Sequence, residues 1–323
     1  MKSIASAPGK IILFGEHFVV HGTKAILAAI DKRVTVTTTF TDDDIVKINS
    51  ELGTLNVPIS SLYKYKEVKS EFRPFVYLAR KWKTSLGLGF DDGCIPSGLE
   101  ITIDSDIPIG VGLGSSSACC VAAATSISGL FNELSSEEIL KTSIEAEKTI
   151  FPDTSGADCA VCTYGGMIEH PSIEKIDNTF DLNLLIANSM IPHNTKNSVE
   201  KVNKFKENDE ERFSQLCDLE TKLIDEVITA MKNNNATTFG LKMSENQKYL
   251  EEIQVSNDTL HDMISSLKEI SLGAKITGAG DGGCIIALVK DENLDKVPAL
   301  LGKDKECFSA KIDTRGVKWS KIA

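Results

Sequence analysis

The chain has 323 residues, of which 41% are hydrophobic and 25% are charged. These proportions exclude collagen-like, fibrous and disordered proteins, and the length suggests two domains or one large one. The formal net charge of −11 argues against a nucleic-acid-binding protein and against a general attraction to anionic membranes. An anionic substrate would therefore need a local positive site.

No apolar run approaches the roughly 18 residues of a membrane helix, and residues 1–9 contain no signal-peptide pattern. The eight cysteines are scattered through apolar segments, which is typical of buried thiols in a reducing compartment. We therefore expect a cytoplasmic protein with no membrane and no nucleic-acid partner.

The predicted elements, taken in chain order, mix strands and helices irregularly. Strands are expected after Lys10 and at 34–40 and 99–104, followed by a buried helix from 117 and a helix from about 136 to 150 that Ser135 and Glu138 cap. Residues 159–164 and 182–187 read as strands. Helical stripes at 213–231, 239–253 and 260–267 precede strands at 274–277, 284–289 and 307–313. This order favours an α+β fold with a domain boundary near 170–182.

The segment at 108–117, PIGVGLGSSS, lies between a predicted strand and the buried helix. Alternate glycines let backbone amides approach a ligand, and a helix that begins at the serines offers free N–H groups to an anion. The segment therefore predicts phosphate binding, although a plain turn with a serine cap has the same composition.

Several nucleotide-binding classes do not match. The chain has neither the Walker pattern GxxxxGK[ST] nor the HRD and DFG motifs of protein kinases. Gly278, Gly280 and Gly283 match GxGxxG, but a strand is expected after them, whereas a dinucleotide site requires a helix.

Three motifs together resemble the GHMP kinase family of small-molecule kinases. They are APGKIILFGEHFVVHG at 7–22, PIGVGLGSSSA at 108–118 and ITGAGDGGC at 276–284. The resemblance implies an α+β fold of two domains, expected at 1–178 and 179–323, the first ribosomal-protein-like and the second ferredoxin-like. It also implies that ATP and substrate meet between them. GEHFVVHG and the Thr154–Asp158 segment are most similar to members that phosphorylate the primary hydroxyl of mevalonate.

The resemblance assigns roles residue by residue. Asp158 matches the base that takes the proton of the substrate hydroxyl, and Lys10 matches the lysine that lies near it. Outside this motif a loop aspartate is usually a cap and a lysine at a strand end is usually solvated. The phosphate-binding set is Pro108, Gly110, Gly112, Leu113, Gly114, Ser115, Ser116, Ser117 and Gly280.

A magnesium site is implied at Ser116 and Glu147, with Ser115 and Ser117 as competitors for the hydroxyl ligand. Glu147 has an independent argument, because it shares a helix face with Leu140 and Ile144. A carboxylate on an apolar face needs a cation or a donor, so a buried ion pair is the alternative.

Glu16, His17 and Thr195 match residues near the substrate, although Asn194 or Thr195 could instead cap a helix. The spacing of His17 and His21 is also seen in zinc sites, but no third ligand accompanies them. The CxxC of Cys159 and Cys162 is single and lies in an expected strand, where its two thiols would face opposite sides.

The resemblance therefore implies an ATP- and Mg²⁺-dependent kinase that acts on mevalonate, and we expect a homodimer. The alternatives are phosphomevalonate or sugar phosphorylation within the same family. Outside it they are a nucleotide-binding regulator without catalysis and, more distantly, a nicotinamide-dependent dehydrogenase.

Overall fold

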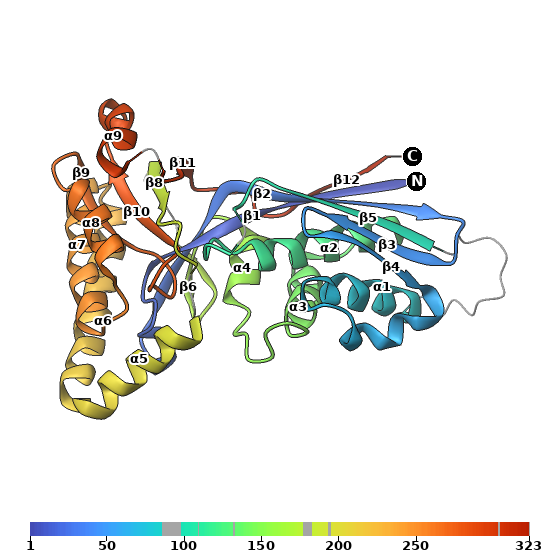
Figure 1. Ribbon diagram of the computed structural model, residues 1–323, viewed down its shortest axis with the longest axis horizontal. Coiled ribbons are helices and arrows are strands. Elements are labelled where there is room, and N and C mark those ends of the chain that lie inside the picture. The colour runs from blue at the N-terminus through green and yellow to red at the C-terminus, as the bar shows by residue number, and fades with distance from the viewer. Residues whose placement is uncertain are drawn as a thin grey trace.

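Two β-sheets and the helices packed on them make up the part of the chain that the computed structural model describes, residues 1–85, 98–108, 110–131, 133–176, 183–192, 195–302 and 304–322 (Figure 1). Strand β1 (Lys2–Phe14) runs from the side of the chain termini toward the second sheet, and β2 (Ala25–Thr41) runs back antiparallel to it. Mixed strands and helices of this kind agree with the predicted α+β class.

The first sheet has the strand order β12-β1-β2-β5-β3-β4, with β6 paired to β2 and β7 paired to β6. The pairs are antiparallel except for β3 with β5. The further strands are β3 (Ile45–Ser50), β4 (Gly53–Pro58), β5 (Gly98–Ser105), β6 (Met167–His170), β7 (Glu174–Ile176) and β12 (Lys318–Ile322). Its helices are α1 (Arg73–Ser85), α2 (Ser115–Phe131), α3 (Ser136–Glu147) and α4 (Ala157–Tyr164).

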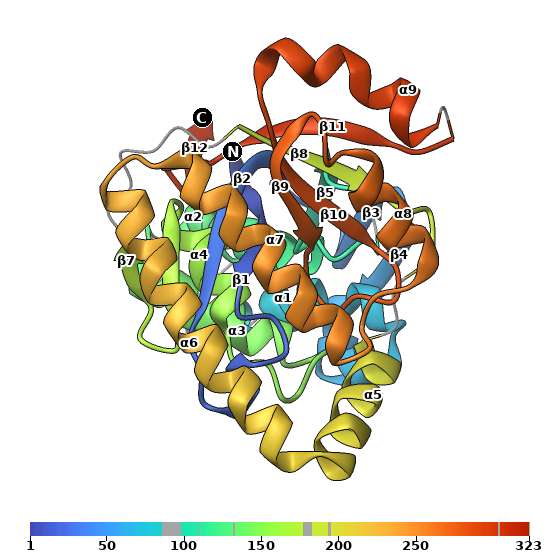
Figure 2. The ribbon, with the colours of Figure 1, turned by 90° about the vertical axis from the view of Figure 1, so that its left-hand side faces the viewer.

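The second sheet is antiparallel, with the order β11-β8-β10-β9. Its strands are β8 (Asn183–Asn188), β9 (Ser271–Ile276), β10 (Cys284–Val289) and β11 (Cys307–Lys311). The helices of this half are α5 (Thr195–Asn208), α6 (Glu210–Lys232), α7 (Ala236–Glu252), α8 (Asp258–Ser266) and α9 (Val297–Leu301). Helices α6 and α7 run side by side along one end of the molecule (Figure 2).

Helix α2 is buried on nearly all sides because its residues are small and apolar, and it packs against β1 and β2. Helix α3 begins with the predicted capping box, in which the Ser135 hydroxyl accepts from the Glu138 amide and the Glu138 carboxylate accepts from the Ser135 amide. These two helices orient the residues of the site.

The prediction of a strand at 159–164 is wrong, because these residues form helix α4. The segment ADCAVCTY is buried almost throughout, and a short apolar run of this kind has no periodicity that separates a strand from a helix. The predicted strand at 284–289 after the second glycine-rich segment is confirmed as β10.

The last strand, β12, was not predicted, and it pairs with β1 at an edge of the first sheet. The preceding segment is fixed by Arg33, which contacts the carboxylate of Asp313 and donates to the Gly316 carbonyl at 2.8 Å. The end of the chain therefore returns to the sheet with which the chain begins, and the predicted domain division at 178 and 179 stays a prediction.

Candidate active site

Lys10 and Asp158 form an ion pair that joins the first sheet to helix α4. The Lys10 Nζ atom lies 3.0 Å from Asp158 Oδ2, and the side chains are 8% and 34% exposed respectively. Asp158 lies in the first turn of α4, where the helix dipole favours a negative charge. The structure therefore brings together the two side chains that the sequence analysis assigned to proton transfer and charge stabilisation.

The first glycine-rich segment packs against the same lysine. The backbone amide of Lys10 donates to the Leu113 carbonyl at 2.9 Å. Gly114 has a φ of +74°, and a Cβ atom at this position would lie 2.5 Å from Lys10 Cγ. Only glycine therefore permits this approach of the loop to the Lys10 side chain.

Helix α2 begins directly after this loop, and its first backbone bond runs from the Ala118 amide to the Gly114 carbonyl at 2.9 Å. The amides of Ser115, Ser116 and Ser117 precede that bond and have no partner within the helix. An anion at this end of α2 would be bound by these N–H groups and by the helix dipole.

Glu147, the last residue of α3, is a buried carboxylate that is bonded to two hydroxyls. Glu147 as a whole is 3% exposed. One oxygen accepts from Ser117 Oγ, and the other accepts from Thr154 Oγ1 at 2.6 Å. No lysine or arginine in the described part of the chain forms an ion pair with it. A buried carboxylate without a cation is a fitting ligand for a metal ion.

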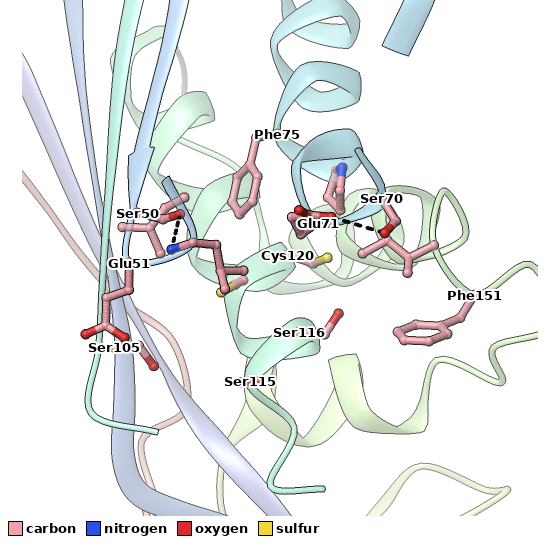
Figure 3. A pocket seen from close by; sticks show the side chains of 15 residues that line it. Ser50, Glu51, Ser70, Glu71, Phe75, Ser105, Ser115, Ser116, Cys120 and Phe151 are labelled. Atoms are coloured by element: carbon pink, nitrogen blue, oxygen red, sulfur yellow. Dashed lines mark hydrogen bonds between the residues drawn. The ribbon is translucent and has the colours of Figure 1, made fainter. Parts of the chain in front are cut away.

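Ser116 lies one position away from the serine that contacts Glu147. Its hydroxyl is buried and has no hydrogen-bond partner. Ser116 lines a cavity, and Figure 3 shows its side chain at the N-terminal end of α2. Ser117, one of the predicted competitors, is thus the serine in direct contact with Glu147, whereas Ser116 presents an unpaired oxygen nearby.

The cavity at this end of α2 was not anticipated from the sequence. It has a volume of about 250 Å³, and it is lined by residues from the β3–β4 turn, the start of α1, β5, α2 and the segment after α3. Most of the lining is apolar, including Leu52, Phe75, Ile103 and Phe151. Figure 3 shows the rings of Phe75 and Phe151 around this space. Lining residues so dispersed in the sequence give no spacing signal.

The second glycine-rich segment, Gly278–Gly283, connects β9 with β10 and contacts the turn after β1. His17 Nε2 donates to the Ala279 carbonyl at 2.8 Å. Burial lowers the pKa of His17, although this hydrogen bond and the charges of Glu16 and Asp281 oppose the effect. His17 is therefore mainly neutral near pH 7, with its proton on Nε2.

Glu16, in the turn after β1, is paired with a lysine of the second sheet. Its side chain is 1% exposed and forms an ion pair with the fully buried ammonium of Lys275. The sequence analysis placed Glu16 beside the substrate and did not anticipate Lys275. A lysine within the apolar run of β9 was a signal that could have found this buried charge.

Thr195 is exposed as the first residue of α5, and Asn194, the other predicted cap, lies outside the described residues. The same helix contacts the second glycine-rich segment through Asp281. Its carboxylate accepts from Lys201 Nζ at 2.7 Å and from Ser198 Oγ at 3.4 Å. Helix α5 is thereby attached to the glycine-rich loop near His17.

Cys159 and Cys162 lie on one helix face rather than on opposite sides of a strand, because the segment is helical. Both thiols are free and buried, and burial raises the pKa of each well above its ordinary value. Such thiols are poor nucleophiles. Within the described ranges, no three His, Cys, Asp or Glu side chains converge on a common metal position.

Comparison with known proteins places these features in a family. The models for the GHMP kinases N terminal and C terminal domains match residues 75–166 and 227–299. Mevalonate kinase of Thermococcus sibiricus is 32% identical over 310 residues, covering 93% of each chain. Mevalonate kinase of Archaeoglobus fulgidus is 35% identical over 291 residues, covering 90% of this chain and 93% of its own. The crystal structure of Methanococcus jannaschii mevalonate kinase is 30% identical with a TM-score of 0.83, covering 96% of this chain and 98% of that one.

The fold and the site define a small-molecule kinase. The chain belongs to the GHMP kinase family, and the predicted family resemblance and two-domain fold are confirmed. Kinase activity in this family implies the use of ATP. No helix among the described residues is both long and apolar enough to span a membrane.

Proposed function

We propose that the protein is a mevalonate kinase, which transfers the γ-phosphate of ATP to the primary hydroxyl of mevalonate and releases ADP and 5-phosphomevalonate. The carrying observation is the Lys10–Asp158 ion pair beside a glycine-rich helix start. The curated relatives named mevalonate kinase, similar over nearly the whole chain, favour mevalonate over phosphomevalonate or a sugar as acceptor.

The geometry supports an in-line transfer with one proton acceptor. The Asp158 carboxylate orients the substrate hydroxyl and takes its proton as the hydroxyl oxygen forms a bond to the γ-phosphorus. The bond from the γ-phosphorus to the bridging β–γ oxygen breaks, and ADP carries away its electron pair. The Lys10 ammonium and the free amides at the start of α2 stabilise the negative charge that spreads over the phosphoryl oxygens.

A magnesium ion fits the donor set next to this pair. Glu147 would hold it with the hydroxyl of Ser116 or Ser117, and the unpaired Ser116 oxygen is a hard ligand of the required kind. The ion would neutralise charge on the β- and γ-phosphates. Because no group of three His, Cys, Asp or Glu side chains converges there among the described residues, phosphate oxygens and water would complete its coordination.

The apolar cavity at the start of α2 is suited to the nucleoside of ATP. Ser115 and Ser116 line it, so a base held there would leave its phosphates at the helix N-terminus. The rings of Phe75 and Phe151 offer apolar surface to a flat base.

The substrate end of the site is proposed at His17 and Thr195. His17 connects the turn after β1 to the second glycine-rich loop, and Thr195 begins the helix that Asp281 attaches to that loop. The homodimer and the cytoplasmic location expected from the sequence stay predictions, which light scattering and cell fractionation would test.

The decisive assay is ADP release, coupled to NADH oxidation, with mevalonate, phosphomevalonate, galactose and homoserine as acceptors. Asp158→Asn should lower kcat with mevalonate by about 10²- to 10⁴-fold and leave ATP affinity within about twofold, because the amide cannot take a proton. Asp153→Asn, at an exposed position in the preceding loop, is the matched control and should keep the parent rate. A near-parental rate for Asp158→Asn would contradict the assignment of the base.

A further inference from the structure

Three side-chain contacts connect the end of β1 to the second glycine-rich loop and to the strand that leads into it. The Thr277 hydroxyl accepts from the Ile12 amide at 3.0 Å and donates to the Ile12 carbonyl at 2.9 Å. The Lys275 ammonium contacts the Glu16 carboxylate, and His17 Nε2 donates to the Ala279 carbonyl at 2.8 Å. The end of β1 and the turn after it are therefore joined to a segment that is far away in the sequence. These three contacts are called the ladder.

Lys275 is the most deeply buried charged residue of this ladder. It is 0% exposed, and its ammonium also donates to the Ile276 carbonyl at 2.8 Å and lies 5.8 Å from the centre of the Phe14 ring. A buried ion pair adds little net stability, because desolvation of both charges offsets their attraction. It does restrict the arrangement of its surroundings, because few geometries satisfy both charges at once.

The Lys275–Glu16 pair and the His17–Ala279 bond close one ring of the structure. Glu16 and His17 are adjacent in the turn after β1. Lys275 lies near the end of β9, and Ala279 lies four residues later in the second glycine-rich loop. The position of His17 relative to that loop is therefore fixed at two points. Strand β1 also contains Lys10, so the ring is tied through one strand to the Lys10–Asp158 pair.

We infer that Lys275 is a positioning residue for the substrate end of the site: by holding Glu16, it keeps His17 in place against the Gly278–Gly283 loop. The inference rests on the proposed function, since it concerns the site where the phosphoryl acceptor binds. Glu16 then acts as the partner of Lys275 and does not itself contact the substrate.

The test compares Lys275→Met, which removes the ammonium and keeps most of the side-chain volume, with the double variant Glu16→Gln/Lys275→Met, which leaves no unpaired buried charge. Arg33→Met is the matched control, because it breaks another largely buried ion pair that holds the C-terminal segment and not this turn. Steady-state kinetics, thermal unfolding and amide hydrogen exchange of residues 15–18 and 278–283 are measured for each.

For Lys275→Met we expect the KM for mevalonate to rise by about 10- to 100-fold, with the KM for ATP within about twofold, because a misplaced binding group weakens positioning of one reactant only. Exchange at 15–18 and 278–283 should become faster. The double variant should regain thermal stability and keep the raised KM. Arg33→Met should unfold at a lower temperature with an unchanged KM for mevalonate.

An unchanged KM for mevalonate in Lys275→Met would overturn the inference. A double variant that regains the parental KM would also overturn it, because the only role of Lys275 would then be to neutralise the buried charge of Glu16. If the parent protein does not use mevalonate, the proposed function fails separately. The kinetic comparison then uses whichever acceptor the parent protein phosphorylates. Hydrogen exchange of the unliganded proteins tests the positioning role without any acceptor: unchanged exchange at 278–283 in Lys275→Met rejects it.

Discussion

Glu220 on α6 is a buried carboxyl group that should make the stability of the fold depend on pH near neutrality. The residue is 0% exposed, and one of its oxygens accepts from Asn246 Nδ2 at 2.7 Å. Burial, followed by the nearby charge of Glu16, raises the pKa of Glu220 to about 7, while Asn246 and Lys275 act in the opposite direction. The folded protein therefore holds a proton here that the unfolded chain releases at a lower pH.

The difference in the pKa of Glu220 between the folded and unfolded states sets the sign and the size of the pH effect on stability. A carboxyl pKa that is higher in the folded state stabilises the fold fully below the ordinary value of 4.5, and the contribution is lost as the pH rises toward about 7. At about 1.4 kcal/mol for each pKa unit, the complete loss is about 3.4 kcal/mol, of which about 2.5 kcal/mol falls between pH 5 and 8.5. With an unfolding entropy of about 2.1 cal/mol/K per residue, this corresponds to a shift in Tm of about 4 °C.

The variant Glu220→Gln is an uncharged isostere that cannot titrate. Calorimetry of the parent and the variant at pH values from 5 to 8.5 should show that Tm of the variant minus Tm of the parent increases by about 4 °C across the range. Histidines that titrate in this range are present in both proteins and cancel in the difference. Glu200→Gln, at an exposed position on α5, is the control and should give a difference independent of pH. If the Tm of Glu220→Gln and the Tm of the parent changed with pH in parallel, the raised pKa of Glu220 would be refuted.

Three other variants probe the site and its support. Gly114→Ala should lower kcat/KM by at least about tenfold in steady-state assays, because the new Cβ would lie 2.5 Å from Lys10 Cγ; an active Ala variant would show that the loop is not held against the lysine. Ser117→Ala should raise the Mg²⁺ concentration for half-maximal rate by about 10-fold or more, because Glu147 loses a hydroxyl partner; an unchanged Mg²⁺ titration would separate Ser117 from the metal site. Ser135→Ala should lower the free energy of unfolding by about 1 kcal/mol through loss of the α3 cap, with unchanged kinetics; a change in KM would mean that this cap affects the position of Glu147 at the other end of α3.

The sequence was informative where chemistry depends on local pattern. Each of three correct predictions depended on the residues of a single element: the capping box at Ser135, the buried helix α2 and the burial of Glu147. The same local reasoning misassigned residues 159–164, because an apolar run shorter than two full helical periods looks alike in both secondary structures.

Features assembled from distant segments could not be predicted in this way. The cavity beside Ser116 draws its lining from five separate parts of the chain, and only one of them, the start of α2, belongs to a motif. Glu16 has the motif context of a substrate residue, but its partner is decided by Lys275 on β9, a strand of the other sheet. Long-range pairing of this kind depends on the tertiary fold, and only the isolated lysine in an apolar strand indicated it.

Strand β1 explains how a site with contributions from both halves of the chain can keep a fixed geometry. It lies between β12 and β2 in the first sheet: β2 pairs with it from Lys2 to Phe14, and β12 pairs with it from Lys2 to Ser6. Along this strand, the Lys10 ammonium contacts Asp158, the Lys10 amide contacts Leu113 in the first glycine-rich loop, and Ile12 contacts Thr277 of the other half. A displacement of Lys10 or Ile12 would break the pairing of β1 with β2, so the core sets the relative positions of Lys10, the first glycine-rich loop and Thr277. This arrangement anchors the proposed phosphoryl-transfer site to a paired strand of the first sheet rather than to loops alone.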